Sequence, residues 1–336
     1  TRAGARALAA TSDLSGRAMV RLAALLHDQG KATRLFQAKL DRALKGGAPE
    51  ADVVRHEVVS YLAWDELARD RSDDELLALL ADPDPVVIER AMHAACRRAH
   101  AFIVETDGGR RRHLPLPGIG VSEAGTTVAG TVAALILTHH RLSPGDRAGG
   151  RPLAEDYMAP AGVVPAEAEL MPATGAAPWD DPDWLARLAR EARTLQADDA
   201  TTVFPLADVY GRTALMMADR LGAARKQAGA AARDGETLRA NTVRTEAGPV
   251  PGDGLLRHTG KVYDDVRAAW RALTAERLSY PALDTEEAPE RVIAPADDGP
   301  ARFAWQGAAA RAAARLSTDR RAGFFGCVIA GTGSGK

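Results

Sequence analysis

The spacing of apolar residues predicts that residues 1–222 of this chain are mostly helical. In VRLAALLHD, Leu22, Leu25 and Leu26 fall on one face of a helix. RHEVVSYLAWDELARD repeats this pattern, TTVAGTVAALILTHH is apolar on nearly every side, and PLADVYGRTALMMADRLGAA is a further helical stretch. We therefore expect a mainly α-helical region, interrupted by a surface loop over about residues 159–178, where Ala, Pro and Gly are frequent.

A change in composition after residue 222 marks a second kind of segment. Residues 223–300 are charged and punctuated by Gly and Pro, and we interpret them as a helical connector with one clear helix, LLRHTGKVYDDVRAAWRALTAERL. Residues 301–336 read as a helix, a short buried strand and a Gly-rich loop, which is how a P-loop α/β domain begins. The chain starts with Thr and stops within this last motif, so we interpret it as a piece of a longer polypeptide.

Bulk composition narrows the class of protein without identifying a function. Of the 336 residues, 46% are apolar and 26% are charged, which is typical of a globular protein with its own core. The formal net charge of −2 means that any contact with nucleic acid would depend on local basic clusters. The cysteines, Cys96 and Cys327, are too few for a disulfide framework and indicate a reducing compartment. No apolar run is long enough to cross a bilayer, so we predict a cytoplasmic protein without membrane contact.

Imidazole and carboxylate groups at the ends of the predicted apolar helices suggest a metal centre. The first helix ends at His27 and Asp28, and the second begins near His56. The third helix ends at His139–His140, and a fourth contains Asp219. Mixed imidazole and carboxylate ligands suit Mn, Fe, Co or Ni. Two such ions can activate a water molecule and stabilise the leaving oxygen of a phosphodiester.

Taken alone, each of these residues has an ordinary structural explanation. A single His on an apolar helix is usually a core residue with hydrogen-bonded ring nitrogens, and His139–His140 could simply interact with the dipole of the helix. The remaining histidines lie outside the pattern. We expect His93 and His100 to be structural, and His113 and His258 to lie on the surface.

The stretch AGTGSGK fits a phosphate-binding loop, in which backbone N–H groups surround the phosphates of a nucleotide. Its contact residues would be Gly331, Thr332, Gly333, Ser334, Gly335 and Lys336. Upstream, Gln306 could read the edge of an adenine while an aromatic residue, Phe303 or Trp305, stacks on its ring. This tail resembles the start of the first motor domain of a superfamily 2 helicase, which implies ATP and Mg as cofactors.

The order of the motifs resembles that of a known family. HDQGK is followed by RHE, THHRL and ADR, the order found in the HD phosphohydrolase superfamily. An HD site followed by a superfamily 2 motor start resembles the CRISPR-associated nuclease–helicases of type I interference systems, and LTHHRL and GFFG are closest to the type I-F branch. The resemblance implies a mainly α fold, in which an HD-superfamily helical domain over residues 1–222 is followed at residues 301–336 by the beginning of a RecA-like α/β helicase domain.

The resemblance also assigns roles to individual residues. It implies that His27 and Asp28 are the catalytic metal pair and that Asp219 closes the site. It implies further metal ligands at His56, His139 and His140. Lys31 either contacts the scissile phosphate or is a solvated lysine that caps the turn. The family usually has another metal-site His upstream of the pair, but residues 1–26 contain none. Either that residue precedes this segment, or the site has one ligand fewer.

We therefore expect a nuclease that cuts single-stranded DNA with one or two divalent transition metal ions and is coupled to an ATP-dependent 3′–5′ helicase. The resemblance implies a type I guide-RNA surveillance complex as a partner and, in the I-F branch, the spacer integrase as another. Basic side chains that could line the path of the DNA are Arg34, Lys39, Arg110, Arg111 and Arg112. Two alternatives stay open: an HD nucleotide phosphohydrolase with a regulatory P-loop, and a non-catalytic recruitment module with a degenerate HD site.

Overall fold

The computed structural model confirms the mainly α class that the sequence predicts. The residues that it describes are 2–47, 52–107, 110–111, 114–118, 126–140, 153, 157–158, 164–197, 207–224 and 238–276. The expected RecA-like start at residues 301–336, including Phe303, Gln306 and the whole phosphate-binding loop, lies outside the described residues.

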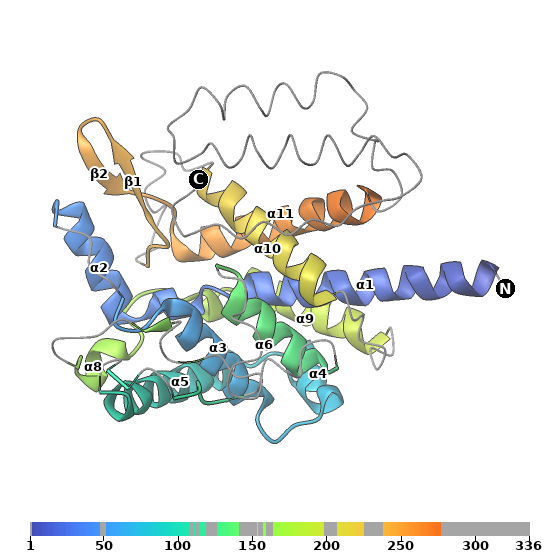
Figure 1. Ribbon diagram of the computed structural model, residues 1–336, viewed down its shortest axis with the longest axis horizontal. Helices are drawn as coiled ribbons and strands as arrows, with labels where there is room; N and C mark the ends of the chain where they lie inside the picture. The colour runs from blue at the N-terminus through green and yellow to red at the C-terminus, as the bar shows by residue number, and fades with distance from the viewer. Residues whose placement is uncertain are drawn as a thin grey trace, which may run out of the picture. The chain divides into compact units, whose positions relative to one another are not determined.

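Helices make up nearly all of the described structure (Figure 1). The α-helices are α1 (Arg2–Leu26), α2 (Arg34–Leu44), α3 (His56–Ala68), α4 (Asp73–Ala81), α5 (Pro85–Glu105), α6 (Val128–Thr138), α8 (Glu167–Leu170), α9 (Pro182–Ala197), α10 (Ala207–Ala224) and α11 (Leu255–Glu276). Short 3₁₀ helices, η1 (Gln29–Ala32) and η3 (Pro178–Asp180), and an antiparallel hairpin of β1 (Thr242–Thr245) and β2 (Gly248–Pro251) are also present. None of the described helices combines the length and apolar character that spanning a membrane requires.

Helices α1 and α3 organise the apolar core. Leu22, Leu25 and Leu26 of α1 are all buried, as their spacing predicts. Helix α1 packs against α6, α9 and α10, while α3 packs against α5 and α6. The buried Trp64 of α3 donates its indole N–H to the carbonyl oxygen of Ala129 in α6 at 2.8 Å. These contacts fix the positions of α1, α3 and α6 relative to one another.

Polar side chains cap the first turns of α2 and α4. The side chain of Thr33 accepts a hydrogen bond from the N–H of Phe36 and begins α2. Ser72 and Glu75 form a capping box at the start of α4. The cap at Thr33 matters for the site described below, because it sets the direction of the chain shortly after the HDQGK motif.

Two segments depart from the expected loop and connector. Within residues 159–178, α8 buries Leu170 completely and packs against α5 and α2, so the expectation of a surface loop is wrong for this part. The helix expected in the connector is confirmed as α11. The hairpin before it was not predicted, because its second strand, GPVP, has a Gly and two Pro residues, which are rare within strands.

The hairpin and α11 are part of the same compact unit as the preceding helices, which extends to Leu273. The buried side chains of α11 include Val262, Tyr263, Val266 and Trp270. A Cβ atom on Gly16 of α1 would lie 2.9 Å from the ring of Trp270, so these helices are in close contact. Just before the hairpin, the backbone of Arg239 accepts from Gln37 of α2 at its carbonyl oxygen and donates to Gln37 through its N–H. Much of the expected connector therefore packs with the helical unit.

We expect Trp270→Ala to lower the free energy of unfolding by about 3–5 kcal/mol, because it leaves a cavity between α11 and α1. Val104→Ala is the control: this side chain is 53% exposed. Its truncation should change the free energy by less than about 0.5 kcal/mol. Urea unfolding followed by circular dichroism measures both values. A Trp270→Ala chain as stable as the wild type would show that α11 does not contribute to the core.

Candidate metal centre

The carboxyl end of α1 places His27 and Asp28 in the protein interior. Both side chains are 0% exposed. The N–H of His27 continues the helix by donating to the carbonyl oxygen of Ala23 at 2.8 Å, and the chain then turns into η1. The Nδ1 atom of His27 lies 2.9 Å from the carbonyl oxygen of Ala24. Nδ1 therefore carries the ring hydrogen, which leaves the lone pair of Nε2 for a ligand.

The turn after this pair brings the start of α3 close to it. Gly30 permits the approach, because a Cβ atom there would lie 2.1 Å from the carbonyl oxygen of His56. The N–H of Gly30 donates to Ser60 Oγ at 2.8 Å, and Ser60 donates to the His56 carbonyl oxygen at 3.0 Å. As a result, His56 Nε2 lies 3.0 Å from Asp28 Oδ1. Gly30 thus sets the distance between the two helices that carry these ligands.

The end of α6 adds two more imidazoles, those of His139 and His140. The buried His139 has its Nδ1 atom 2.6 Å from the carbonyl oxygen of Ile136, so that its Nε2 is also left for a ligand. The centroid of its ring lies 4.8 Å from that of His27. The His140 ring lies 5.4 Å from the His56 ring, measured between centroids. The structure therefore brings together these histidines as the sequence predicts.

Helices α10 and α11 close the site with a carboxylate and a further imidazole. His258 Nε2 lies 3.2 Å from Asp219 Oδ1 and 3.0 Å from Asp28 Oδ2. Asp219 Oδ2 in turn lies 3.8 Å from His140 Nδ1. The expectation that His258 lies on the surface is wrong, because its side chain is 1% exposed.

A signal for His258 was present in the sequence. Leu255, Val262 and Val266 recur with it at helical spacing, so His258 lies on the apolar face of α11. Its position also bears on the missing upstream histidine. Among the described residues, the additional imidazole at the His–Asp pair comes from downstream in the chain and not from upstream, where the resemblance placed it.

The ligand atoms form two sets, and Asp28 faces both. One set comprises His27, Asp28, Asp219 and His258, and the other comprises His56, His139 and His140. Within each set the ligand atoms lie within 4.8 Å of one another. Buried atoms without a hydrogen-bond partner include His27 Nε2, Asp28 Oδ1, His56 Nε2 and His139 Nε2. Because an unpaired buried polar atom is destabilising by about 1–3 kcal/mol, this concentration of them fits a site for divalent metal ions.

Nearby positive charge keeps the carboxylates of the site ionised. Burial raises the pKa of Asp28, but His27 and Lys31 outweigh this effect and hold the pKa well below its ordinary value. Burial also raises the pKa of Asp219, and the hydrogen bond from His258 outweighs it, so that this pKa is lowered as well. Both carboxylates are therefore in the form that binds cations at neutral pH.

The imidazoles differ in their protonation. Burial lowers the pKa of His139 well below its ordinary value, and burial together with His56 lowers that of His140 to about 4. Both rings are therefore neutral at pH 7, which is the form that binds metal. Burial also lowers the pKa of His258, but its hydrogen bonds to the site carboxylates outweigh this effect and raise the pKa. His258 therefore carries a proton more readily than His139 or His140 does when no ion is bound.

Glu57 supports His56 from the side opposite to the pair. Its Oε2 atom lies 3.3 Å from His56 Nδ1, while Oε1 accepts from Arg55 Nε at 2.8 Å. Burial raises the pKa of Glu57, but the adjacent His56 outweighs it, and the pKa is lowered. An ionised carboxylate beside Nδ1 keeps the ring hydrogen there and directs Nε2 towards the site, as second-layer partners of metal-binding histidines commonly do.

Lys31 is buried, and its ammonium group donates to Asp28 Oδ2 at 2.7 Å. The interpretation of Lys31 as a solvated lysine is therefore wrong. Its contact with a scissile phosphate stays a prediction. Of the other histidines, His93 pairs with Glu89 and His100 with Glu167 at longer distances, and neither belongs to the ligand sets found among the described residues. His113 lies outside the described residues.

A buried His–Asp pair at a helix end, joined by imidazoles and a second carboxylate from other helices, defines an HD-type metal-dependent phosphohydrolase. The sequence model of the family described as "Cas3, HD domain" matches residues 1–227, and the chain therefore belongs to this family. His258 lies beyond the matched residues, although it lies within the site.

One curated relative also has Cas3 in its name. The chain is 34% identical over 134 residues to the "CRISPR-associated nuclease/helicase Cas3 subtype I-F/YPEST" of Pseudomonas aeruginosa (strain UCBPP-PA14). The matched segment covers 40% of this chain and 11% of that relative. The similarity therefore concerns a small part of a much longer protein.

We expect His258→Ala to weaken binding of Mn²⁺ by at least about tenfold, because one imidazole of the first ligand set is lost. Isothermal titration of the chelator-treated chain measures the affinity. His93→Ala is the control, since it removes an imidazole that belongs to neither set. Equal affinities of the His258→Ala chain and the control would show that His258 is not a ligand.

We expect Glu57→Gln to weaken Mn²⁺ binding by roughly 10–100-fold, because the amide no longer provides a charged acceptor for His56 Nδ1. Glu89→Gln makes the same change at an exposed site on α5. Titration of both variants separates a local effect from a change in net charge. If the two variants bind Mn²⁺ alike, Glu57 does not orient His56.

Proposed function

We propose that this chain is a metal-dependent nuclease that hydrolyses phosphodiester bonds of single-stranded DNA. The observation that carries the proposal is the position of Asp28 between the two ligand sets. Its Oδ1 atom lies 3.0 Å from His56 Nε2, and its Oδ2 atom lies 3.0 Å from His258 Nε2. A carboxylate shared in this way suits a centre that neutralises the several oxygens of a phosphate group.

The residues of the chain prepare the site for this chemistry. When bound, divalent transition metal ions such as Mn, Fe, Co or Ni would supply Lewis-acid activation of water and neutralise charge on the phosphodiester. The ligands would be His27, Asp28, His56, His139, His140, Asp219 and His258. Lys31 holds Asp28 in place by donating to its Oδ2 atom. Its positive charge would then lie close to a phosphate bound at the site. In the reaction, water adds to phosphorus, the bond to one bridging oxygen breaks, and that oxygen takes up a proton.

The burial of the His–Asp pair favours a flexible substrate. His27 and Asp28 are fully enclosed, and His139 is nearly so. A phosphodiester must therefore bend towards the site, which a single strand does more readily than a stiff duplex. Of the basic residues considered above, Arg34 and Lys39 lie on α2, directly after the HD motif, and are the ones that we assign to the approach.

For the complete protein, we propose coupling to an ATP- and Mg-dependent 3′–5′ helicase. Its nucleotide contacts would include Phe303, Gln306 and the loop at residues 331–336, in the expected motor segment. The relative named above supports this pairing, because its printed name contains both nuclease and helicase. We further propose that a type I guide-RNA surveillance complex delivers single-stranded DNA in the cytoplasm, with the spacer integrase as a second partner.

We expect the wild-type chain, supplied with Mn²⁺, Co²⁺, Ni²⁺ or Fe²⁺, to cut circular single-stranded DNA. Asp28→Ala should lower the rate roughly 100-fold or more, because both ligand sets lose their shared carboxylate. His93→Ala should cut like the wild type. Gel electrophoresis of the circular substrate follows the reaction, and a chelator should stop it.

The outcomes separate the alternatives. Equal cutting by the wild type and Asp28→Ala would exclude this centre as the source of activity. Hydrolysis of nucleotides without cutting of DNA would favour a small-molecule phosphohydrolase. A folded chain that binds none of the four metals would favour a recruitment module.

A further inference from the structure

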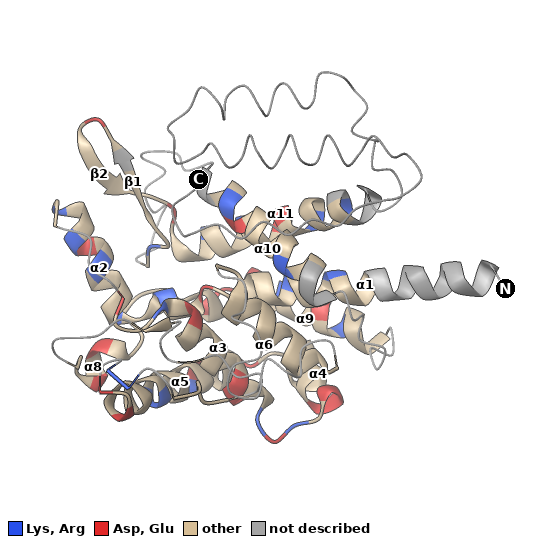
Figure 2. Cartoon of the chain, in the orientation of Figure 1, with Lys and Arg blue, Asp and Glu red and all other residues tan. Residues whose placement is uncertain are grey.

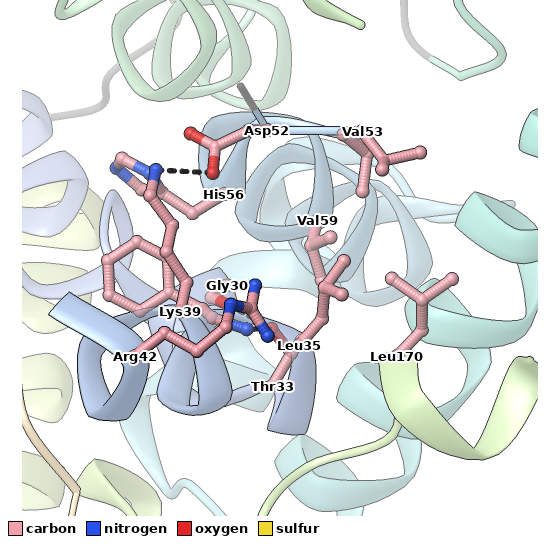
Figure 3. A pocket seen from close by; sticks show the side chains of 12 residues that line it. Gly30, Thr33, Leu35, Lys39, Arg42, Asp52, Val53, His56, Val59 and Leu170 are labelled. Atoms are coloured by element: carbon pink, nitrogen blue, oxygen red, sulfur yellow. Dashed lines mark hydrogen bonds and ion pairs between the residues drawn. The ribbon is translucent and has the colours of Figure 1, made fainter. Parts of the chain in front are cut away.

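A pocket lies directly beside the candidate metal centre, and one of its walls is the ligand His56 (Figure 3). The residues that line this pocket include Gly30, Phe36, Lys39, Arg42 and Val53. They come from η1, from α2 and from the segment that precedes α3. Because His56 Nε2 points towards Asp28, an occupant of this pocket would be adjacent to the site of hydrolysis.

Phe36 gives this pocket an aromatic surface. Its ring is partly exposed and, among the described residues, stands outside the main apolar core. The ring centroid lies 5.5 Å from that of His56, at an angle of 67°. The ammonium groups of Lys31 and Lys39 each lie 5.9 Å from the same centroid. Phe36 is thus held between a metal ligand and two cations.

Helix α2, which carries Phe36, has an excess of basic side chains (Figure 2). Lys39 and Arg42 line the pocket, and Arg34 is the first residue of the same helix. The acidic residue of this helix, Asp41, is paired with Arg239. Lys39 and Asp52 both line the pocket and form an ion pair at 2.5 Å. A phosphate bound there would therefore compete with the Asp52 carboxylate for Lys39, whereas Arg42 adds a second cation to the lining.

We propose that Phe36 is a stacking platform for the base next to the scissile phosphate of a single DNA strand, with Lys39 and Arg42 facing the neighbouring backbone phosphate. This inference rests on the proposed function and specifies how its substrate is held. An aromatic ring flanked by cations is the combination that binds single-stranded nucleic acid without sequence preference, since every base has a flat face. It also selects single strands, because the bases of a duplex are already stacked on one another.

The first test compares Phe36→Ala and Phe36→Trp with Val86→Ala, which truncates an exposed apolar residue on α5. We expect Phe36→Ala to raise KM for single-stranded DNA roughly tenfold, which corresponds to the loss of one base–aromatic stack. Phe36→Trp should restore the wild-type KM, and kcat and Mn²⁺ affinity should change little. A Phe36→Ala chain with wild-type KM would overturn the proposal.

The second test replaces the natural strand by one of equal length made of abasic nucleotides. The effect of Phe36→Ala should disappear on this strand, because no base remains to stack. An equal effect on both strands would assign Phe36 a purely structural role and overturn the proposal.

A binding measurement separates this proposal from the proposed function. Fluorescence anisotropy of a labelled single strand is measured with Asp28→Asn and with Asp28→Asn/Phe36→Ala. Weaker binding by the double variant supports the stacking platform even if the wild type cuts no DNA, which would refute the nuclease alone. Equal binding by the two variants overturns the platform even if the wild type is an active nuclease.

Discussion

The structure depends on how a fully buried carboxylate, that of Asp28, is compensated. An isolated ionised group in a protein interior is strongly unfavourable unless opposite charge or hydrogen-bond donors surround it. Asp28 meets this requirement with the Lys31 ammonium at 2.7 Å and with the His258 imidazole at 3.0 Å. Its other oxygen faces His56 Nε2 at 3.0 Å, where a bound cation would complete the compensation. Lys31 lies one turn further along the chain, whereas His56 and His258 come from α3 and α11, so the fold must bring distant segments to this charge.

The helical core provides this arrangement. Contacts of α1 with α6 and α10 bring the end of the HD motif to the histidine pair and to Asp219. Gly30 allows α3 to approach so closely that a side chain at position 30 would collide with the carbonyl oxygen of His56. Helix α11 adds His258 while it packs its aromatic residues against α1. The candidate metal centre therefore includes a helix that lies beyond residues 1–227, the part that matches the family.

The mainly α fold and most of the site were predictable because local patterns encode them. Apolar residues at helical spacing mark the core helices, and the candidate metal ligands lie at the ends of those helices, as with His27 and Asp28. His258 was missed because it lies in a charged segment far from the other motifs, and only its place on an apolar face distinguished it. The burial of Lys31 and the packing of α8 against α5 and α2 arise from tertiary contacts, which spacing along the chain does not reveal. The roles of Glu57 and Phe36 likewise depend on contacts with His56 that only the structure shows.

The central claim is that these side chains meet around metal ions. The most direct measurement is a crystal structure of the chain with Mn²⁺, in which anomalous scattering locates each ion. We expect ions within coordination distance, about 2 Å, of Asp28, with His258 contacting one and His56 near the other. Anomalous peaks elsewhere in the molecule, or none at this cluster with Mn²⁺ in excess, would contradict it.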